Sequence, residues 1–129
     1  MVIDTSAVAA ILFDEPDAAT LEGKIADDPV RLMSAATFLE AAIVIEARLG
    51  NAGGREFDLW LHRADIEILG VDADQADLAR RAWRRFGRGR HPADLNYGDC
   101  FSYALAAARD EPLLFKGDDF AKTDVKACA

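Results

Sequence analysis

The sequence predicts an α/β layered fold with a mostly parallel sheet, and three observations support this fold class. Short apolar segments typical of strands alternate with longer segments typical of helices along all 129 residues. Such alternation is typical of strand–helix–strand units that build a parallel sheet. The composition, 51% hydrophobic and 29% charged, is that of a globular chain, and no linker or internal repeat interrupts it. A single domain over residues 1–129 is therefore expected.

In the first half of the chain, helices are expected to begin at capping residues. Asp4 ends the first apolar run, and Thr5 or Ser6 can cap the helix that follows. Ser34 can cap a longer helix that ends at Gly50, and because this helix is apolar nearly all round we expect it to be buried. The elements expected are a strand at 2–3, a helix carrying 7–12, a helix at 16–27, a strand at 31–33 and a helix at 35–50.

The second half continues the alternation of strands and helices. Either Asp72 or Asp74 can open one helix, and Asn96 can cap the most apolar helix of the chain. The last strand is expected to break at Gly117. The segments expected are a turn at 51–54, a helix at 55–64, a strand at 66–71, a helix ending at 86, a loop at 87–94, a helix from 96 and a strand at 113–115.

Charge and cysteine content exclude several classes of protein. The net charge of −8 argues against a protein that coats nucleic acid through a broad cationic surface. The two cysteines, Cys100 and Cys128, form no CxxC pair and have no histidine partner, which indicates a reduced, cytoplasmic protein. Neither an export signal nor an uninterrupted apolar run of about 18 residues is present, so no membrane contact is expected.

Acidic residues are expected to gather at one edge of the sheet, because ligands of open parallel sheets bind beyond the carboxyl ends of the strands. The acidic positions near that edge are Asp4, Glu40, Asp99 and the pair Asp118–Asp119. Each has a simpler explanation as a turn, cap or loop residue, and Asp99 can complete a capping box with Asn96. Glu40 is harder to explain in this way. Its helical face carries Ile43 and Val44, and an unpaired buried carboxylate is costly.

If these carboxylates converge, they need a positive partner. Two carboxylates about 4 Å apart repel by about 4 kcal/mol at an effective dielectric constant of about 20. Protonation is one way to relieve this repulsion. However, an all-oxygen donor set without histidine or cysteine suits Mg²⁺ or Mn²⁺. Such an ion can bind a phosphate oxygen and lower the pKa of a bound water, so phosphodiester hydrolysis is the reaction expected.

Four segments of the sequence resemble the motifs of PIN-domain ribonucleases, specifically the VapC toxins of bacterial toxin–antitoxin pairs. The segments are, in order, VIDTSA with Asp4, SAATFLEAA with Glu40, LNYGDCFSYALA with Asp99, and LLFKGDDF with Asp118 or Asp119. The resemblance covers essentially the whole chain. It implies a three-layer α/β/α domain, endoribonuclease activity that depends on Mg²⁺ or Mn²⁺, inhibition by a small antitoxin, and a homodimer.

The resemblance also implies a role for each acid. Asp4 and Asp99 would bind the metal directly, and Glu40 would be a ligand or a base that holds water. The last acid would contact a second metal site, for which we favour Asp119, although many relatives place this acid earlier, where this chain has Gly117. The residues expected to support the ligands are Thr5, Ser6, Asn96 and Asp118.

The basic segment RRAWRRFGRGRH is the candidate for RNA binding. Six of the fifteen basic residues lie between Arg80 and Arg90. The simplest interpretation is a solvated helix face with Trp83 or Phe86 in the core, which we favour for the aromatic residues, whereas for the arginines we favour contact with RNA. The residues expected to bind RNA are Arg85, Arg88, Arg90 and Lys116.

A different class of function is also compatible with the sequence. In this alternative the chain is a catalytically weak PIN-like module that acts by forming a complex with an antitoxin or RNA, and its acids are caps and loop residues. The presence of all the principal acids favours the enzyme. Phe57, Trp60 and Leu61 are expected in the core, although their helix can also form one wall of an apolar groove for an antitoxin helix.

Overall fold

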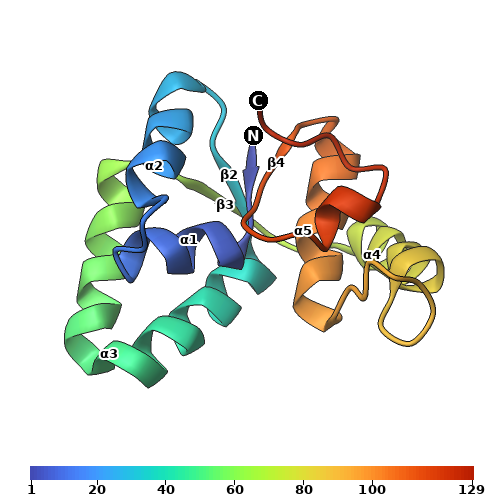
Figure 1. The fold of residues 1–129 in the computed structure, drawn as a ribbon, viewed down its shortest axis with the longest axis horizontal. Helices are drawn as coiled ribbons and strands as arrows, with labels where there is room; N and C mark the ends of the chain where they lie inside the picture. Colours follow the sequence, from blue (N-terminus) through green and yellow to red (C-terminus); the bar gives the residue numbers. More distant parts are fainter.

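The computed structural model describes residues 1–129 and shows a four-stranded, all-parallel sheet with helices on both faces (Figure 1). The strand order across the sheet is β3-β2-β1-β4. The strands are β1 (Val2–Ile3), β2 (Leu32–Ser34), β3 (Glu67–Leu69) and β4 (Leu113–Leu114). Since every pairing is parallel, the carboxyl ends of all four strands meet at one edge of the sheet. The α/β fold class with a parallel sheet is confirmed.

The helices form two layers, one on each face of the sheet (Figure 1). On one face lie α1 (Thr5–Leu12), α2 (Ala18–Asp27) and α3 (Ala35–Arg63). On the other face lie α4 (Ala73–Phe86) and α5 (Tyr97–Arg109), and the short 3-10 helix η1 (Phe120–Lys122) follows β4. This is the three-layer α/β/α arrangement that the sequence resemblance implied.

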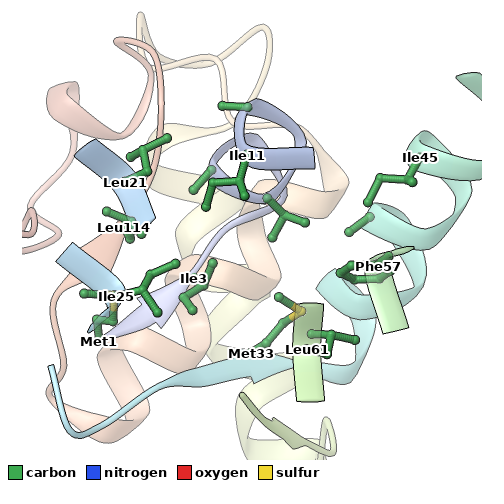
Figure 2. Packing of buried hydrophobic residues seen from close by; sticks show 14 residues of the cluster. Met1, Ile3, Ile11, Leu21, Ile25, Met33, Ile45, Phe57, Leu61 and Leu114 are labelled. Atoms are coloured by element: carbon green, nitrogen blue, oxygen red, sulfur yellow. The ribbon is translucent and has the colours of Figure 1, made fainter. Parts of the chain in front are cut away.

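Two separate apolar clusters fill the spaces between the sheet and its helices. Neighbouring strand residues point to opposite faces, so Ile3 belongs to the cluster with α1, α2 and α3 whereas Val2 belongs to the cluster with α4 and α5. Figure 2 shows the first cluster, in which Ile3 and Met33 from the sheet lie near Leu61 of α3. Each face of the sheet therefore packs against one of the two helix layers.

Helix α3 differs from the expectation in two ways. The predicted turn at 51–54 is wrong, because the chain leaves helical geometry only at Gly50 (φ 67°, ψ −163°) and is helical again directly afterwards. Burial nearly all round is also wrong. The first half of α3 packs on α1 along one face, and its other face exposes Leu39 (59%), Ile43 (61%) and Val44 (38%).

Other element boundaries agree closely with the sequence. Helix α2 begins at Ala18, two residues later than expected, and β3 is shorter than the predicted strand at 66–71. Asp72 rather than Asp74 caps α4, since its Oδ1 accepts a hydrogen bond from the Gln75 N–H at 2.8 Å. No helix is both long and apolar enough to cross a membrane.

Candidate active site

Asp4 lies at the end of β1, and it caps helix α1 in place of Thr5 or Ser6, so that expectation was wrong. Its Oδ2 accepts hydrogen bonds from the Ser6 N–H (3.0 Å) and the Ser6 hydroxyl (2.7 Å). Its Oδ1 accepts a hydrogen bond from the Ser102 hydroxyl at 2.6 Å. Asp4 is only 2% exposed, so its carboxylate has little contact with water. Three hydrogen-bond donors from the protein satisfy it at the edge of the sheet.

Ser102 and Thr37 are polar groups of this site that the sequence analysis did not assign. Both are buried, and their hydroxyl oxygens lie 3.1 Å apart, so a chain of hydrogen bonds joins Thr37 on α3 to Ser102 on α5 and then to Asp4. The only indication of Ser102 in the sequence was its distance along the chain from Asp99. Ser102 follows Asp99 by three positions, so it shares that face of a largely apolar helix.

Glu40 reaches from α3 to the beginning of α5. Its Oε1 accepts a hydrogen bond from the Thr5 hydroxyl at 2.6 Å, which provides the partner that the sequence analysis required. The Glu40 carboxylate lies so close to Gly98 that a Cβ at that position would overlap it. The glycine of the NYGDC segment therefore makes room for Glu40. The argument from its helical face was wrong, however, because Ile43 and Val44 are exposed.

Asp99 forms a capping box with Asn96 at the start of α5. The Asn96 side chain accepts from the Asp99 N–H, and the Asp99 Oδ2 accepts from the Asn96 N–H, both at 2.9 Å. The cap does not exclude a second role. The pKa of Asp99 is raised from 3.8 to about 6. Burial is the largest cause, the Asn96 hydrogen bond opposes it, and the charges of Asp4, Glu40 and Asp119 contribute to the rise.

The field at Asp99 therefore identifies the set of acids that share this edge of the sheet. We call Asp4, Glu40, Asp99 and Asp119 the acidic rim. Asp119, and not Asp118, is among the main charges that raise the Asp99 pKa. Between these two neighbours, Asp119 therefore acts more strongly on Asp99.

The donor chemistry of the acidic rim fits a hard divalent cation. As the side chains lie, no group of three or more acidic, histidine or cysteine residues closes around one point. Mg²⁺ does not require such a group, since it commonly keeps several waters and binds through one or two carboxylates together with substrate oxygens. Asp99 and Asp4 supply carboxylates, and Glu40 and Asp119 add further negative charge. Burial first, and then these charges, raise the pKa of Asp99, and a bound cation would favour its charged form.

The supporting hydroxyls lie beside the acids, whereas the cations expected to bind RNA are scattered. Thr5 donates to Glu40, and Ser6 donates to Asp4 and also accepts from the Lys116 N–H at 3.0 Å. The Lys116 ammonium itself turns away, because it bonds the carboxylates of the α1–α2 connection, Glu15 (3.1 Å) and Asp17 (3.2 Å).

The three arginines of the basic segment occupy different environments. Arg85 pairs with Asp124 at 3.2 Å and lies over the Phe86 ring. Arg88 lies 3.5 Å from Asp94, and the Arg90 guanidinium covers the Trp83 ring at 4.2 Å. Phe86 is buried as expected, but Trp83 is 42% exposed, so only one of the two aromatic residues belongs to the core.

Comparison with known proteins defines the class to which this fold and rim belong. The family model described as PIN domain matches residues 1–126. Among solved structures, Mycobacterium tuberculosis VapC20, described as a sarcin–ricin loop cleaving toxin, superposes with a TM-score of 0.79 at 17% identity, covering 96% of this chain and 95% of that chain. A toxin–antitoxin complex from Klebsiella pneumoniae gives a TM-score of 0.73 at 16% identity, covering 95% and 92%.

Sequence relatives are more specific. A protein named Ribonuclease VapC from Mycolicibacterium smegmatis is 68% identical, covering 98% of each chain. Ribonuclease VapC30 from Mycobacterium tuberculosis is 60% identical, covering 100% of this chain and 98% of the relative. The chain therefore belongs to the VapC family of PIN-domain ribonucleases, as the resemblance in its sequence indicated.

The contact between Gly98 and Glu40 generates a first prediction. In Gly98→Ala the new Cβ displaces the Glu40 carboxylate, and since this is the end of a flexible side chain the fold should survive. We expect an unchanged midpoint of thermal unfolding without metal, but a loss of about tenfold or more in Mn²⁺ affinity, measured by the metal-induced rise of that midpoint. Gly23→Ala, where a Cβ meets nothing within 4 Å, is the control. An equal Mn²⁺ response in both variants would contradict this role.

The raised pKa of Asp99 generates a second prediction. Because the folded-state pKa of Asp99 (about 6) exceeds its ordinary value of 3.8, Asp99 keeps its proton between these values in the folded chain and loses it in the unfolded chain. The contribution of Asp99 to stability is therefore greatest below about pH 4 and is lost as the pH rises through about 6. We expect Asp99→Asn to reduce this loss in metal-free thermal unfolding scans between about pH 4 and pH 8, whereas the exposed Asp74→Asn control should not. An undiminished loss in Asp99→Asn would show that other groups cause it.

Proposed function

We propose that this chain is the toxin of a toxin–antitoxin pair, an endoribonuclease that hydrolyses RNA phosphodiester bonds with Mg²⁺ or Mn²⁺ at the acidic rim. The observation that carries this proposal is that three acids from distant segments, Asp4, Glu40 and Asp119, act on the charge of a fourth, Asp99. Membership of the VapC family supports the same function, since its named members are ribonucleases. The reaction is proposed to take place in the cytoplasm.

Each side chain of the rim has a distinct part in this reaction. Asp99 and Asp4 would hold the ion, which when bound would supply positive charge for the phosphate oxygens and lower the pKa of a bound water. The Ser6 and Ser102 hydroxyls fix the Asp4 oxygens. Glu40, oriented by Thr5, would hold the attacking water, and Asp119 would contact a second cation.

The decisive experiment replaces single carboxylates by amides. Asp4→Asn and Asp99→Asn each remove one rim charge and retain an acceptor oxygen, so the hydrogen bonds from Ser6 and Asn96 can persist. We expect each to reduce Mg²⁺-dependent RNA cleavage by more than the roughly 10–100-fold typical of groups that only support ligands. Cleavage is measured on cellular RNA by mapping new RNA ends.

The control for this experiment is Asp74→Asn, which makes the same chemical change on the exposed first turn of α4. Its cleavage should equal that of the wild type, and chelation of divalent cations should abolish both. Undiminished cleavage by Asp4→Asn and Asp99→Asn would refute the metal mechanism. Absence of cleavage by the wild type would favour the alternative, a module that acts through complex formation alone.

The antitoxin is proposed to bind a cavity of about 670 Å³ between α1, α2 and the second half of α3. Its apolar wall includes Ile11, Ile25 and Trp60, and Leu59 in the same wall is 50% exposed. Arg31, Arg63, Glu22 and Glu56 add charge to the lining. An amphipathic helix with apolar residues on one face matches this combination. The Klebsiella pneumoniae structure, a toxin–antitoxin complex, shares the fold.

Placing a charge in this groove should separate antitoxin binding from catalysis. We expect Leu59→Asp to weaken capture of the co-expressed antitoxin by about tenfold or more while RNA cleavage persists, because a carboxylate would be desolvated against Trp60. Affinity is measured by titrating purified toxin with antitoxin. Val71→Asp, which is exposed and does not line the groove, is the control. Equal antitoxin affinity in the two variants would place the antitoxin elsewhere.

A homodimer is proposed to form through the exposed face of the first half of α3. Leu39, Ile43 and Val44 form an apolar row on one helix, and contiguous exposed apolar surface of this kind marks a contact with another molecule. Glu40 lies between these residues in sequence, so the dimer face borders the acidic rim. Two rims would then lie close to one another in the dimer.

A further inference from the structure

A second cavity, of about 550 Å³, lies between helices α4 and α5. Its volume is in the range typical of ligand sites. Its walls are mainly apolar, with Ala79 and Cys100 at the base and Trp83, Tyr97 and Phe101 among the lining residues. We call it the α4–α5 pocket.

The aromatic side chains of this pocket are exposed, and their rings are held in place. Trp83 is 42% exposed and Tyr97 is 82% exposed. The backbone at Gly87 lies so close to Trp83 that a Cβ there would overlap the indole, and the Arg90 guanidinium lies over the same ring at 4.2 Å without lining the pocket. Tyr97 packs edge-on against Phe101 with ring centroids 4.9 Å apart. These contacts fix flat apolar surfaces that face solvent.

The two charged residues that line the pocket, Arg80 and Arg88, are both positive, although the chain as a whole carries −8. Arg90 lies beside it, and no acidic residue belongs to its lining. Arg80 forms no ion pair, and Arg88 has only the 3.5 Å contact with Asp94. The groove between α1, α2 and α3, by contrast, has acids and arginines together. The α4–α5 pocket therefore suits an anionic ligand with a flat apolar group.

The pocket adjoins the acidic rim at the beginning of α5. Asn96 lines the pocket and at the same time exchanges both hydrogen bonds of the capping box with Asp99. Tyr97 precedes Asp99 by two positions in the same first turn of α5. A chain whose phosphate lies at Asp99 can therefore place a neighbouring group in the pocket.

We propose that the α4–α5 pocket receives an unpaired nucleobase of the RNA substrate, stacked on Trp83 or Tyr97, while Arg80 and Arg88 bind adjacent phosphates. This inference rests on the ribonuclease function proposed above and adds a subsite for one nucleotide next to the cleaved bond. Stacking on aromatic side chains is the usual way in which proteins bind bases of single-stranded RNA, because an unpaired base offers both faces. A paired base inside a duplex cannot enter such a pocket, so the substrate segment is single-stranded.

The direct test uses the fluorescence of Trp83. The chain contains two tryptophans, so in Trp60→Phe the remaining indole is Trp83. The metal-free variant is titrated with single-stranded poly(A) and, separately, with inorganic polyphosphate, which carries similar charge but no bases. We expect poly(A) to quench Trp83 and polyphosphate to leave it unchanged at equal phosphate concentration. Equal responses to the two polymers would show binding by charge alone and would overturn the proposal.

Variants separate stacking from charge. We expect Trp83→Ala and Tyr97→Ala each to weaken poly(A) binding by about tenfold without changing its salt dependence, and Trp83→Phe and Tyr97→Phe to restore most of the affinity. Arg88→Ala should instead make the salt dependence shallower. Since Tyr97 is 82% exposed, its truncation should not affect folding, which keeps the test valid if Trp83→Ala is unstable. Wild-type affinity in both alanine variants would overturn the proposal.

Two further measurements assign any failure to the correct hypothesis. If the wild-type chain cleaves no RNA but poly(A) still quenches Trp83, the ribonuclease function fails and the base-binding pocket stands. If RNA is cleaved but Trp83→Ala and Tyr97→Ala have wild-type KM values, the pocket fails and the function stands. If these variants turn a dimer into a monomer in sedimentation without RNA, the aromatic residues belong to a protein interface, and the base-binding proposal is refuted.

Discussion

The burial of the Asp4 carboxylate is the constraint on which the acidic rim depends. A carboxylate that is almost wholly removed from water needs hydrogen-bond donors on both oxygens, and here they come from the first turn of α1 and from the middle of α5. The Ser102 hydroxyl spans 98 positions of sequence to reach Asp4. This one contact ties the end of β1 to the helix that carries Asp99, so the two acids keep a fixed relation.

The beginnings of helices α1 and α5 supply positive electrostatic potential at the acidic rim. Asp4 caps α1, Asp99 lies in the first turn of α5, and Glu40 lies against the backbone of the same turn at Gly98. The partial positive charge of a helix start stabilises each of these anions. No arginine or lysine side chain bonds to them, and the Lys116 ammonium is bonded to Glu15 and Asp17 instead. The rim is thus left with excess negative charge, which favours a metal ion over a protein cation.

Local signals in the sequence predicted most of the fold. Ser34, Asp72 and Asn96 begin helices as expected, because a side-chain cap acts within three residues of the chain. The segment at 51–54 misled the prediction because its glycines suggested a turn. In the structure Gly53 and Gly54 instead allow close approach to side chains of the preceding helical half. That requirement is invisible without knowing how the two halves pack.

The acids of the rim were proposed from their positions after strands and at helix starts, and Thr5 and Ser6 from the resemblance of the first motif. Ser102, Thr37 and Gly98 were not, because their contacts are with residues far away in the chain, and for Ser102 only its spacing from Asp99 gave a signal. The exposure of Leu39 and Ile43 was missed for a related reason. Hydrophobic periodicity shows that a helix has apolar faces but does not show whether its own chain covers them.

The backbone break at Gly50 has a consequence for how such proteins diversify. It divides α3 into one half that carries Glu40 to the rim and another that carries Leu59 and Trp60 to the proposed antitoxin groove. Substitutions in the second half can change partner recognition without disturbing the chemistry of the first. A bacterium that keeps several related pairs could in this way insulate each toxin from the inhibitors of the others while all retain one catalytic apparatus.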